Sequence, residues 1–116
     1  MSTSPIPKTL VSRSPARNFA SLGEIPMSTP DDVRAKVIAA RTAFPAWAGL
    51  PLADRISHLS RLRDQFTERR AELAELMSLE MGMPITQSLF TVDRALSYMN
   101  WSLSNAPTYL APEVTY

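Results

Sequence analysis

Three glutamates supply the first candidate chemistry in this sequence, because a pair of carboxylates can act as general acid and general base. Glu72, Glu75 and Glu80 lie within one predicted helix. Arg69 and Arg70 come just before them, and acids beside arginines on a helix usually form a solvated, ion-paired surface. We therefore interpret the three glutamates as surface residues and predict no catalytic residue among them.

Methionines and aromatic residues form the second candidate group. Thioethers can bind soft metals or line a peptide groove, and the methionines in question are Met77, Met81, Met83 and Met99. Aromatic rings can stack on a nucleobase or a sugar, and the rings in question are Trp47, Tyr98 and Trp101. Both groups fall within helical apolar patterns without an adjacent basic cluster. We predict that they pack in the structure and bind no ligand.

His58 is the only histidine in the sequence, and one imidazole cannot form a zinc site by itself. On a helix surface its neighbours would be Asp54 and Asp64. Ser57 would point about 100° away from His58, which excludes a hydrogen-bonded nucleophile and base made of these two residues. The predicted set of metal-binding residues is therefore empty.

Cysteine and glycine usage excludes further chemistry within these residues. The sequence has no cysteine, which rules out disulfides, thiolate ligands and a cysteine nucleophile supplied by this chain. The glycines are too scattered for a phosphate-binding loop, since they are Gly23, Gly49 and Gly82. We predict that this chain alone binds no cofactor.

Composition and charge indicate one continuous segment. The 116 residues suffice for one domain, and 45% of them are hydrophobic. Twelve basic residues against eleven acidic ones leave a net charge of +1, which provides no electrostatic basis for binding nucleic acid. No apolar run approaches the roughly 20 residues that cross a bilayer. We predict no nucleic-acid partner, no membrane partner and a cytoplasmic location.

The start of the chain offers an alternative to that location. It is rich in serine and arginine and contains no acid before Glu24, a composition typical of mitochondrial transit peptides. Pro5, Pro7 and Pro15 argue against this alternative, because prolines interrupt an amphipathic helix. We predict a flexible N-terminus over residues 1–8.

Residues 9–26 predict a β-hairpin. Strand-forming residues alternate weakly over 9–13, and a second extended run covers 19–25. The segment between them, Ser14-Pro15-Ala16-Arg17-Asn18, has the composition of a turn. Asn18 is a candidate for left-handed backbone there, because asparagine tolerates a positive φ better than other side chains do.

Residues 29–106 predict a helical region, and its first helix has a clear start. Thr29-Pro30-Asp31-Asp32 combines a hydroxyl cap, a proline at the first helical position and an acid three residues after the cap. Pro45 should kink or loosen this helix because it lacks an N–H group. Gly49 should then end it.

Two further helices are predicted before Gly82. One begins at about Pro51 or Leu52, and the next covers about residues 71–81. The two can alternatively form one bent helix. Gly82 should end the second of them, as glycine commonly does at a helix C-terminus.

The last predicted helix runs from about Pro84, a favourable residue at a helix start, to about Asn105. Pro107 and Pro112 interrupt the pattern beyond it. We therefore predict that residues 107–116 form an extended exit segment.

Each predicted helix carries an apolar stripe at helical spacing. From the first helix to the last, the stripes comprise Val33, Val37, Ala40, Phe44 and Trp47; Leu52, Ile56, Leu59, Leu62 and Phe66; Leu73, Leu76, Met77 and Met81; and Ile85, Leu89, Val92, Leu96, Met99 and Leu103. The last stripe also fits a coiled coil, although it lacks the flanking charge pairs of a zipper. Phe90, Tyr98 and Trp101 lie off that stripe, which predicts neighbours on two sides of the last helix.

Four stretches together resemble one enzyme family. They are Phe44-Pro45-Ala46-Trp47, the segment from Glu72 to Pro84, Val92-Asp93-Arg94-Ala95-Leu96 and Asn105-Ala106-Pro107. With them, the chain from about Leu10 to Glu113 resembles the N-terminal part of an NAD(P)-dependent aldehyde dehydrogenase. The segment from Glu80 to Gln87 is similar to the succinate-semialdehyde dehydrogenase branch. Met83 and Thr91 depart from the lysine and the acid that the family usually has.

The resemblance implies a fragment of an α/β fold, here mainly α with about four helices after a hairpin. In the family these elements are scaffold packed against the coenzyme-binding domain. The family oxidises aldehydes to carboxylic acids through a cysteine nucleophile, with NAD or NADP as cofactor. Its cysteine, its catalytic asparagine and glutamate and its nucleotide-binding glycines have no counterpart in these residues. We therefore expect an N-terminal fragment that is not catalytic alone.

Two alternatives remain open at the level of sequence. The chain can be a small helical interaction or scaffold module that self-associates or binds a dehydrogenase subunit. It can also be an unrelated helical bundle, which would be a compact monomer with its apolar stripes covered. If the family resemblance holds, the expected partner is the missing C-terminal portion of the dehydrogenase or a homologous subunit.

Overall fold

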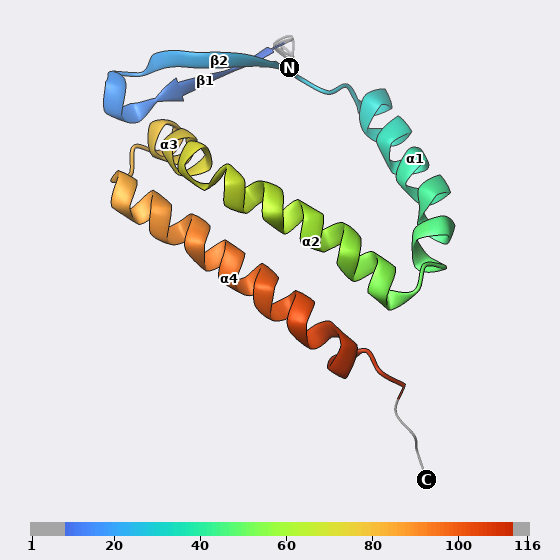
Figure 1. Ribbon diagram of the computed structural model, residues 1–116. Coiled ribbons are helices and arrows are strands. Elements are labelled where there is room, and N and C mark those ends of the chain that lie inside the picture. Colours follow the sequence, from blue (N-terminus) through green and yellow to red (C-terminus); the bar gives the residue numbers. More distant parts are fainter. Residues whose placement is uncertain (1–8, 113–116) are drawn as a thin grey trace.

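The computed structural model describes residues 9–112. A two-stranded hairpin comes first and four α-helices follow it in chain order (Figure 1). This agrees with the predicted fold class of a mainly helical chain after a β-hairpin. The predicted flexible N-terminus, 1–8, and the end of the predicted exit segment, 113–116, lie outside the described residues.

The hairpin pairs β1 (Thr9–Ser14) with β2 (Ala20–Pro26) in antiparallel register, and a short 3-10 helix, η1 (Pro15–Arg17), connects them. An irregularity between Ser12 and Arg13 shifts the register. Asn18 has the predicted left-handed backbone, with φ of 50°. Phe19 has φ of 58° as well, which the sequence analysis did not anticipate and which is unusual for a large side chain.

Helix α1 (Pro30–Ala48) begins at the predicted cap. The Asp32 amide donates to the Thr29 hydroxyl at 3.1 Å, and the Thr29 amide donates to the Asp32 carboxylate at 2.8 Å. This reciprocal capping box satisfies amides that the first helical turn leaves without partners. The helix continues through Pro45 without interruption, and it ends before Gly49, whose amide donates to the Pro45 carbonyl at 3.0 Å.

Helices α2 (Leu52–Glu68) and α3 (Arg70–Met81) follow each other almost directly, and the Leu73 amide donates to the Arg69 carbonyl at the junction. Two adjoining helices and one bent helix therefore differ here by a single residue. Only Arg69 lies between them, with φ of −96° and ψ of 16°. Gly82 ends α3 in left-handed backbone with φ of 69°, the conformation that glycine adopts without a Cβ penalty.

Helix α4 (Ile85–Tyr109) is longer than predicted. The prediction of an extended segment from residue 107 is wrong over residues 107–109, because the helix continues through Pro107. A proline in the last turns removes a single backbone hydrogen bond. Just before it, the Asn105 side chain donates to the Trp101 carbonyl at 2.8 Å, and the Leu110 amide donates to the Ala106 carbonyl after it.

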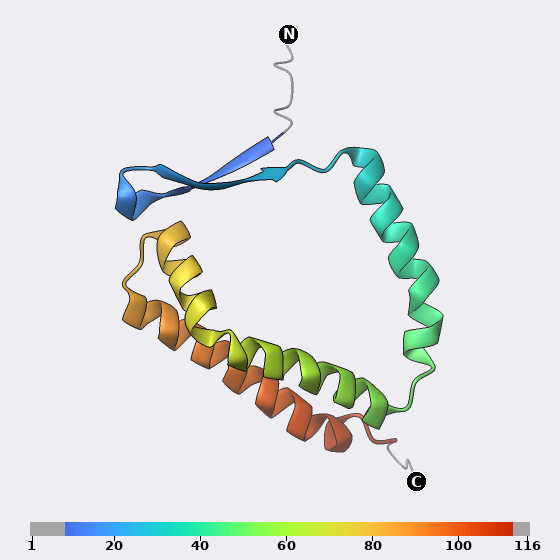
Figure 2. The ribbon, with the colours of Figure 1, turned by 45° about the horizontal axis from the view of Figure 1, so that its top comes forward.

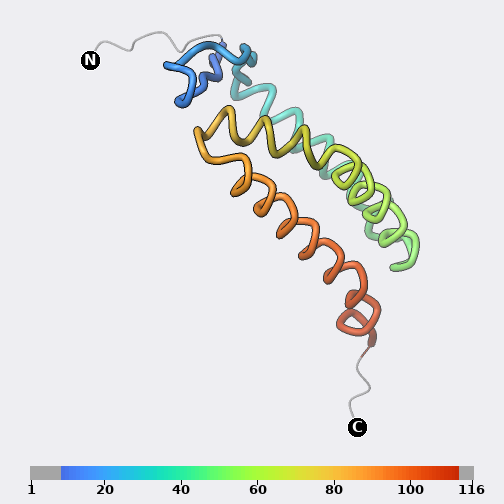
Figure 3. Tube along the Cα trace, turned by 60° about the vertical axis from the view of Figure 1, so that its left-hand side comes forward, coloured from blue at the N-terminus to red at the C-terminus, as the bar shows by residue number. Residues whose placement is uncertain are grey.

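The helices form a layer and not a closed bundle. Helix α4 runs back along α2 and α3, and the hairpin lies over the far end of α3 (Figures 2 and 3). Helix α1 stands away from this layer along most of its length, on the other side of a wide bend (Figures 1 and 2). No residue of α1 is buried, although the whole helix is described.

The core is correspondingly small. Among residues 9–112, the buried hydrophobic residues are Ala74 and Val92, and the buried polar residues are Ser14 and Ser88. The predicted stripe of α3 is only partly covered, since Leu76 is 50% exposed. A stripe in a single layer meets a neighbour on one side only, so part of it stays exposed to solvent.

Candidate interaction surface

The α3–α4 elbow, Gly82 to Pro84, is held by several hydrogen bonds. Gly82 supplies the left-handed turn, and its amide donates to the Ser78 carbonyl at 2.9 Å. The Ser78 hydroxyl in turn donates to the Met83 carbonyl at 2.7 Å. Pro84 then caps α4 and accepts from the Ser88 amide at 3.1 Å. Backbone and side-chain bonds therefore both fix the chain reversal.

Two polar contacts link α4 to the helices beside it. Arg70 binds Asp93 through two hydrogen bonds, of which the one between Nη2 and Oδ2 is 2.6 Å long. Arg63 of α2 donates to the Asn100 side chain at 3.1 Å. Because a bidentate guanidinium–carboxylate pair constrains orientation as well as distance, the Arg70–Asp93 pair sets how α3 lies against α4.

The same pair shifts the ionisation of its partners. The hydrogen bond from Arg70 lowers the pKa of Asp93, and it raises the pKa of Arg70 in return. On the other side of α3, the hydrogen bond from Arg69 likewise lowers the pKa of Glu72. In α1, hydrogen bonds from Thr29 lower the pKa of Asp32. All four shifts favour the charged forms that make these contacts.

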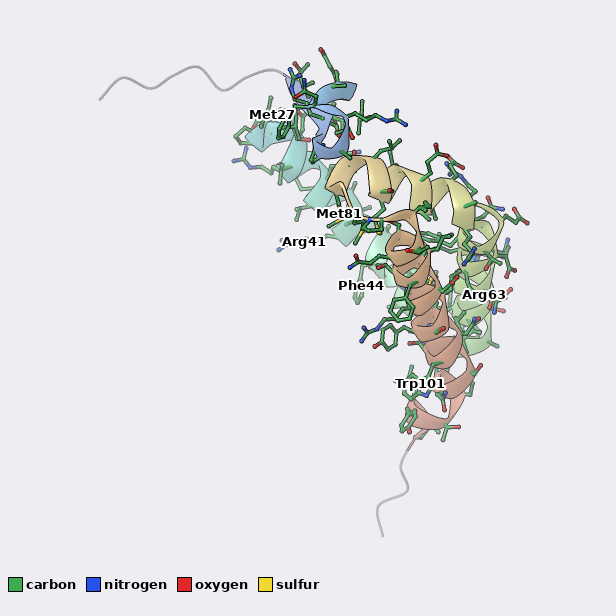
Figure 4. The ribbon with its side chains drawn as sticks, turned by 90° about the vertical axis from the view of Figure 1, so that its left-hand side faces the viewer. Met27, Arg41, Phe44, Arg63, Met81 and Trp101 are labelled. Atoms are coloured by element: carbon green, nitrogen blue, oxygen red, sulfur yellow. The ribbon has the colours of Figure 1, made fainter. Side chains whose placement is uncertain are left out.

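An apolar groove lies between α3 and α4, with a volume of about 350 Å³. Its lining is apolar apart from one acid and one hydroxyl, and comprises Phe66, Leu73, Leu76, Met77, Glu80, Met81, Thr91, Val92 and Ala95. Met81, at the end of α3, is 65% exposed (Figure 4). No titratable pair converges in this groove, so its chemistry is that of apolar packing.

A second hollow of about 230 Å³ lies at the other end of the layer, between α2 and α4. Its lining includes Trp47 from the end of α1, Ile56 and Leu59 from α2, and Leu103 from α4. Apolar surface therefore continues along the α2–α4 layer from the elbow to the exit of α4.

The outer face of α4 adds exposed aromatic rings. Phe90 is 65% exposed and Trp101 58% exposed, and Trp101 lies toward the end of α4 away from the elbow (Figure 4). The guanidinium of Arg94 stands 5.6 Å from the centre of the Tyr98 ring, within the range of a cation–π contact. The prediction that these rings lie off the main stripe agrees with their exposure. The Trp101 ring lies 5.9 Å from the Tyr109 ring of the same helix, and within residues 9–112 no further element covers this face.

Two of the three candidate glutamates, Glu72 and Glu80, bind different partners. Glu72 binds Arg69 at 2.6 Å, as the ion-paired interpretation predicts. Glu80 instead accepts a hydrogen bond from Ser12 of the hairpin at 2.8 Å. Since the two carboxylates have different partners on different elements, they form no acid–base pair.

The other candidate residues are equally dispersed. Among the described residues there is no group of three or more His, Cys, Asp and Glu side chains that could hold a metal ion. His58 shares a hydrogen bond with Arg61 through Nδ1 at 3.2 Å, and its ring lies 5.9 Å from that of Trp47. Met77 and Met81 line the apolar groove, and Met99 lines a further shallow hollow on α4.

The sequence did not predict the two long-range polar contacts that fix α3, Arg70–Asp93 and Ser12–Glu80. Arg70 and Asp93 are far apart in the sequence, and so are Ser12 and Glu80. No local spacing rule connects residues at such separations. A search for charged residues at the helix ends would have found Arg70, but not its partner.

Comparison with known proteins shows to which family this chain belongs. The model of the aldehyde dehydrogenase family matches residues 2–115, which is nearly the whole chain. The chain belongs to the aldehyde dehydrogenase family. The predicted recognition is thereby confirmed, and the alternative of an unrelated helical bundle is wrong.

Several semialdehyde dehydrogenases are similar to this aldehyde dehydrogenase chain. The succinate-semialdehyde dehydrogenase (NADP+) GabD of Escherichia coli (strain K12) is 33% identical over 84 residues, which are 72% of this chain and 17% of that enzyme. N-succinylglutamate 5-semialdehyde dehydrogenase 2 of Caulobacter vibrioides is 46% identical over 61 residues, which are 53% of this chain and 13% of that enzyme. The chain thus spans less than one fifth of these relatives.

A solved structure confirms the fold. Glyceraldehyde-3-phosphate dehydrogenase GapN from Methanocaldococcus jannaschii, in complex with NADP, superposes with a TM-score of 0.86 at 19% sequence identity. The match covers 95% of this chain and 24% of that one. The hairpin and four helices are therefore a part of the aldehyde dehydrogenase fold. In the part of the chain that the structure describes, no helix is long and apolar enough to span a membrane.

Proposed function

We propose that these residues form the N-terminal helical part of an enzyme that oxidises an aldehyde to a carboxylic acid with NAD or NADP. The family match over residues 2–115 carries this proposal. The role of this part is structural, because the sequence supplies no cysteine nucleophile. It offers the rest of the enzyme a rigid elbow and an apolar surface.

The exposed groove supports that role. Leu76 is 50% exposed and Met81 65% exposed at its wall, and burying apolar area contributes about 25 cal/mol per Å². A partner that fills the groove must offer apolar side chains, since few polar groups line it. The coenzyme-binding remainder of the dehydrogenase is the occupant that this proposal assigns.

The substrate class belongs to the same proposal. Relatives named for succinate, malonate and glutarate semialdehydes all match this chain at 31–33% identity. We therefore propose a semialdehyde as the substrate of the whole enzyme. Its location in the cytoplasm remains a prediction from the sequence.

A chimeric enzyme tests the structural role. The segment of the E. coli succinate-semialdehyde dehydrogenase that matches this chain is replaced by the corresponding residues of this chain. The chimera should reduce NADP with succinate semialdehyde, measured by absorbance at 340 nm, whereas the 116-residue chain alone should reduce neither NAD nor NADP. A chimera that folds and binds NADP but has no activity would contradict a purely structural role.

A matched pair of variants makes that test specific. Val92→Glu places a charge at a buried groove position, and it should abolish assembly of the chimera. Lys36→Glu changes charge on the exposed helix α1 and should leave the activity within about twofold, as surface substitutions usually do. Equal loss in both variants would argue that the groove has no special part in assembly.

A small interaction module is the second candidate function. The exposed faces of α1 and α4 favour it, because large exposed apolar patches mark interaction sites. Sedimentation of the purified chain distinguishes the two functions. A stable complex with itself at low micromolar concentration, with no restored activity in the chimera, would favour the module.

A further inference from the structure

The hairpin contacts the helical layer at α3, beside the α3–α4 elbow. Both β1 and η1 contact α3. Ser14, where β1 meets η1, is fully buried although the hairpin is otherwise mostly exposed. The attachment is therefore local, and it lies at the end of the hairpin that carries the turn (Figure 2).

Gly82 is the residue of the elbow that the hairpin turn contacts, through Pro15 and Ala16. A Cβ atom at Gly82 would lie 3.3 Å from the Cβ of Pro15 and 3.7 Å from the Ala16 amide nitrogen. The residue also has φ of 69°, a left-handed conformation that is strained in a residue with a side chain. Glycine thus meets two requirements here, the left-handed turn of the elbow and the close approach of the hairpin.

A second contact lies beside the first. The Ser12 hydroxyl donates to Oε1 of Glu80 at 2.8 Å. Glu80 and Met81 also line the apolar groove, and both come just before Gly82. The hairpin therefore holds the last turn of α3, which forms one wall of the groove.

We propose that the hairpin turn is a strap that holds the α3–α4 elbow, with Pro15 seated on Gly82 and Ser12 bound to Glu80, so that its attachment controls the shape of the groove. This inference does not depend on the catalytic proposal. The strap acts within this chain, and releasing it should loosen the elbow while the distant end of α4 stays unchanged.

Disulfide trapping tests the seat directly, because the sequence contains no cysteine to interfere. The 3.3 Å separation of the two Cβ positions lies just below the range of about 3.5–4.5 Å for disulfides. The variant Pro15→Cys/Gly82→Cys should therefore cross-link within the monomer under oxidised glutathione. The control Pro15→Cys/Gly49→Cys should not, since Pro15 is absent from the atoms around Gly49.

The contact of Pro15 with Gly82 is refuted if Pro15→Cys/Gly82→Cys cross-links no faster than the control. This holds provided that the circular dichroism of the variant matches that of the parent chain. Loss of the cross-link in urea would show that folded structure brings the cysteines together. Because cysteine at position 82 strains the backbone, a second measurement leaves Gly82 intact.

Hydrogen exchange measures the strap without that strain. Ser12→Ala/Pro15→Gly removes both contacts and should speed exchange several-fold at the amides of Gly82, Gln87 and Ser88, which the elbow protects. The Leu110 amide at the far end of α4 should be unaffected. Glu80→Gln keeps a side-chain oxygen that accepts from Ser12 and should preserve slow exchange.

The groove supplies the last readout. Anilinonaphthalene sulfonate, an anionic dye that binds exposed apolar surface, should change its fluorescence when the strap is released. Its signal in the Glu80→Gln chain should equal that of the parent chain. Unchanged exchange at the elbow in Ser12→Ala/Pro15→Gly, or unchanged dye fluorescence with faster exchange, would overturn the control of the groove by the hairpin.

Discussion

At the scale of single residues, the fold depends on a few positions that hold the elbow and the helix starts. Gly82 has left-handed backbone and also lies against Pro15 of the hairpin. Arg70 and Asp93 bind across two helices. Each of these residues sets the direction of an element much larger than itself.

Replacing Gly82 by alanine should destabilise the chain by about 1–2 kcal/mol, the cost of left-handed backbone in a residue with a Cβ. The approach of Pro15 to 3.3 Å adds to this loss. Gly23→Ala is the matched control, because a Cβ there meets nothing within 4 Å. Urea unfolding followed by circular dichroism compares them, and equal stability of the two variants would contradict the prediction.

Acid should weaken the link between α3 and α4. The pKa of Asp93 is lowered by Arg70 in the folded chain, so the folded state favours the carboxylate. The stabilisation is fully present above the unfolded pKa of about 4, and it is lost as the pH falls through the lower, folded pKa. Asp93→Asn should remove this part of the acid sensitivity.

The measurement is the free energy of unfolding as a function of pH between about 2 and 7, which brackets the carboxylate pKa range. Glu75→Gln, an exposed change elsewhere on α3, serves as control and should keep the dependence of the parent. An unchanged pH profile in Asp93→Asn would mean that the pair contributes nothing to stability.

At the scale of elements, the helices differ in what supports them. Helix α1 has no buried residue, and apart from Trp47 at its end, which lies near His58, it depends mainly on its own hydrogen bonds and caps. Helices α3 and α4 support each other through Val92, Ala74 and the Arg70–Asp93 pair. Most helical stability in proteins comes from tertiary packing, so a helix with little of it relies more on its cap.

Thr29→Ala should lower the stability of α1 by about 1 kcal/mol, the typical cost of losing an N-cap side chain. The capping box between Thr29 and Asp32 is lost with it. Thr42→Ala is the control, because Thr42 only donates back to the Ile38 carbonyl within the same helix. Far-ultraviolet circular dichroism should show lower helicity in Thr29→Ala and none of that loss in Thr42→Ala.

At the scale of the whole molecule, the chain is open. Its radius of gyration is 19.9 Å, against roughly 13 Å for a compact domain of this length. Its accessible surface is 9666 Å², and a compact protein of this mass exposes only about 6,300 Å². The helical layer and the hairpin therefore leave a large surface for further packing.

The isolated chain should self-associate through this surface. Sedimentation velocity over a range of concentrations should show a rising average mass, because exposed apolar groups such as Leu76 and Phe90 lower their free energy by contact. Leu76→Glu/Phe90→Glu should reduce the association. Lys36→Glu makes the same change in net charge on α1 and should not, and a concentration-independent monomer would contradict the prediction.

Much of this protein was determined by its sequence alone. The capping box at Thr29, the left-handed Asn18, the glycine that ends α3 and the family membership all follow from short stretches of sequence, because caps, turns and motifs depend on neighbouring residues. Pro107 misled the prediction, since the cost of one proline near a helix end is small enough for the helix to continue.

Only the tertiary structure decided which distant residues meet and which stripes stay exposed. The pairing of Arg70 with Asp93 and the seat of Pro15 on Gly82 depend on the angle between elements, which no local spacing encodes. An apolar stripe predicts that one face of a helix is stabilised by packing against another element, but not that such an element is present. In this chain Leu76 and Met81 therefore remain exposed, because a single layer of helices covers only one side of each stripe.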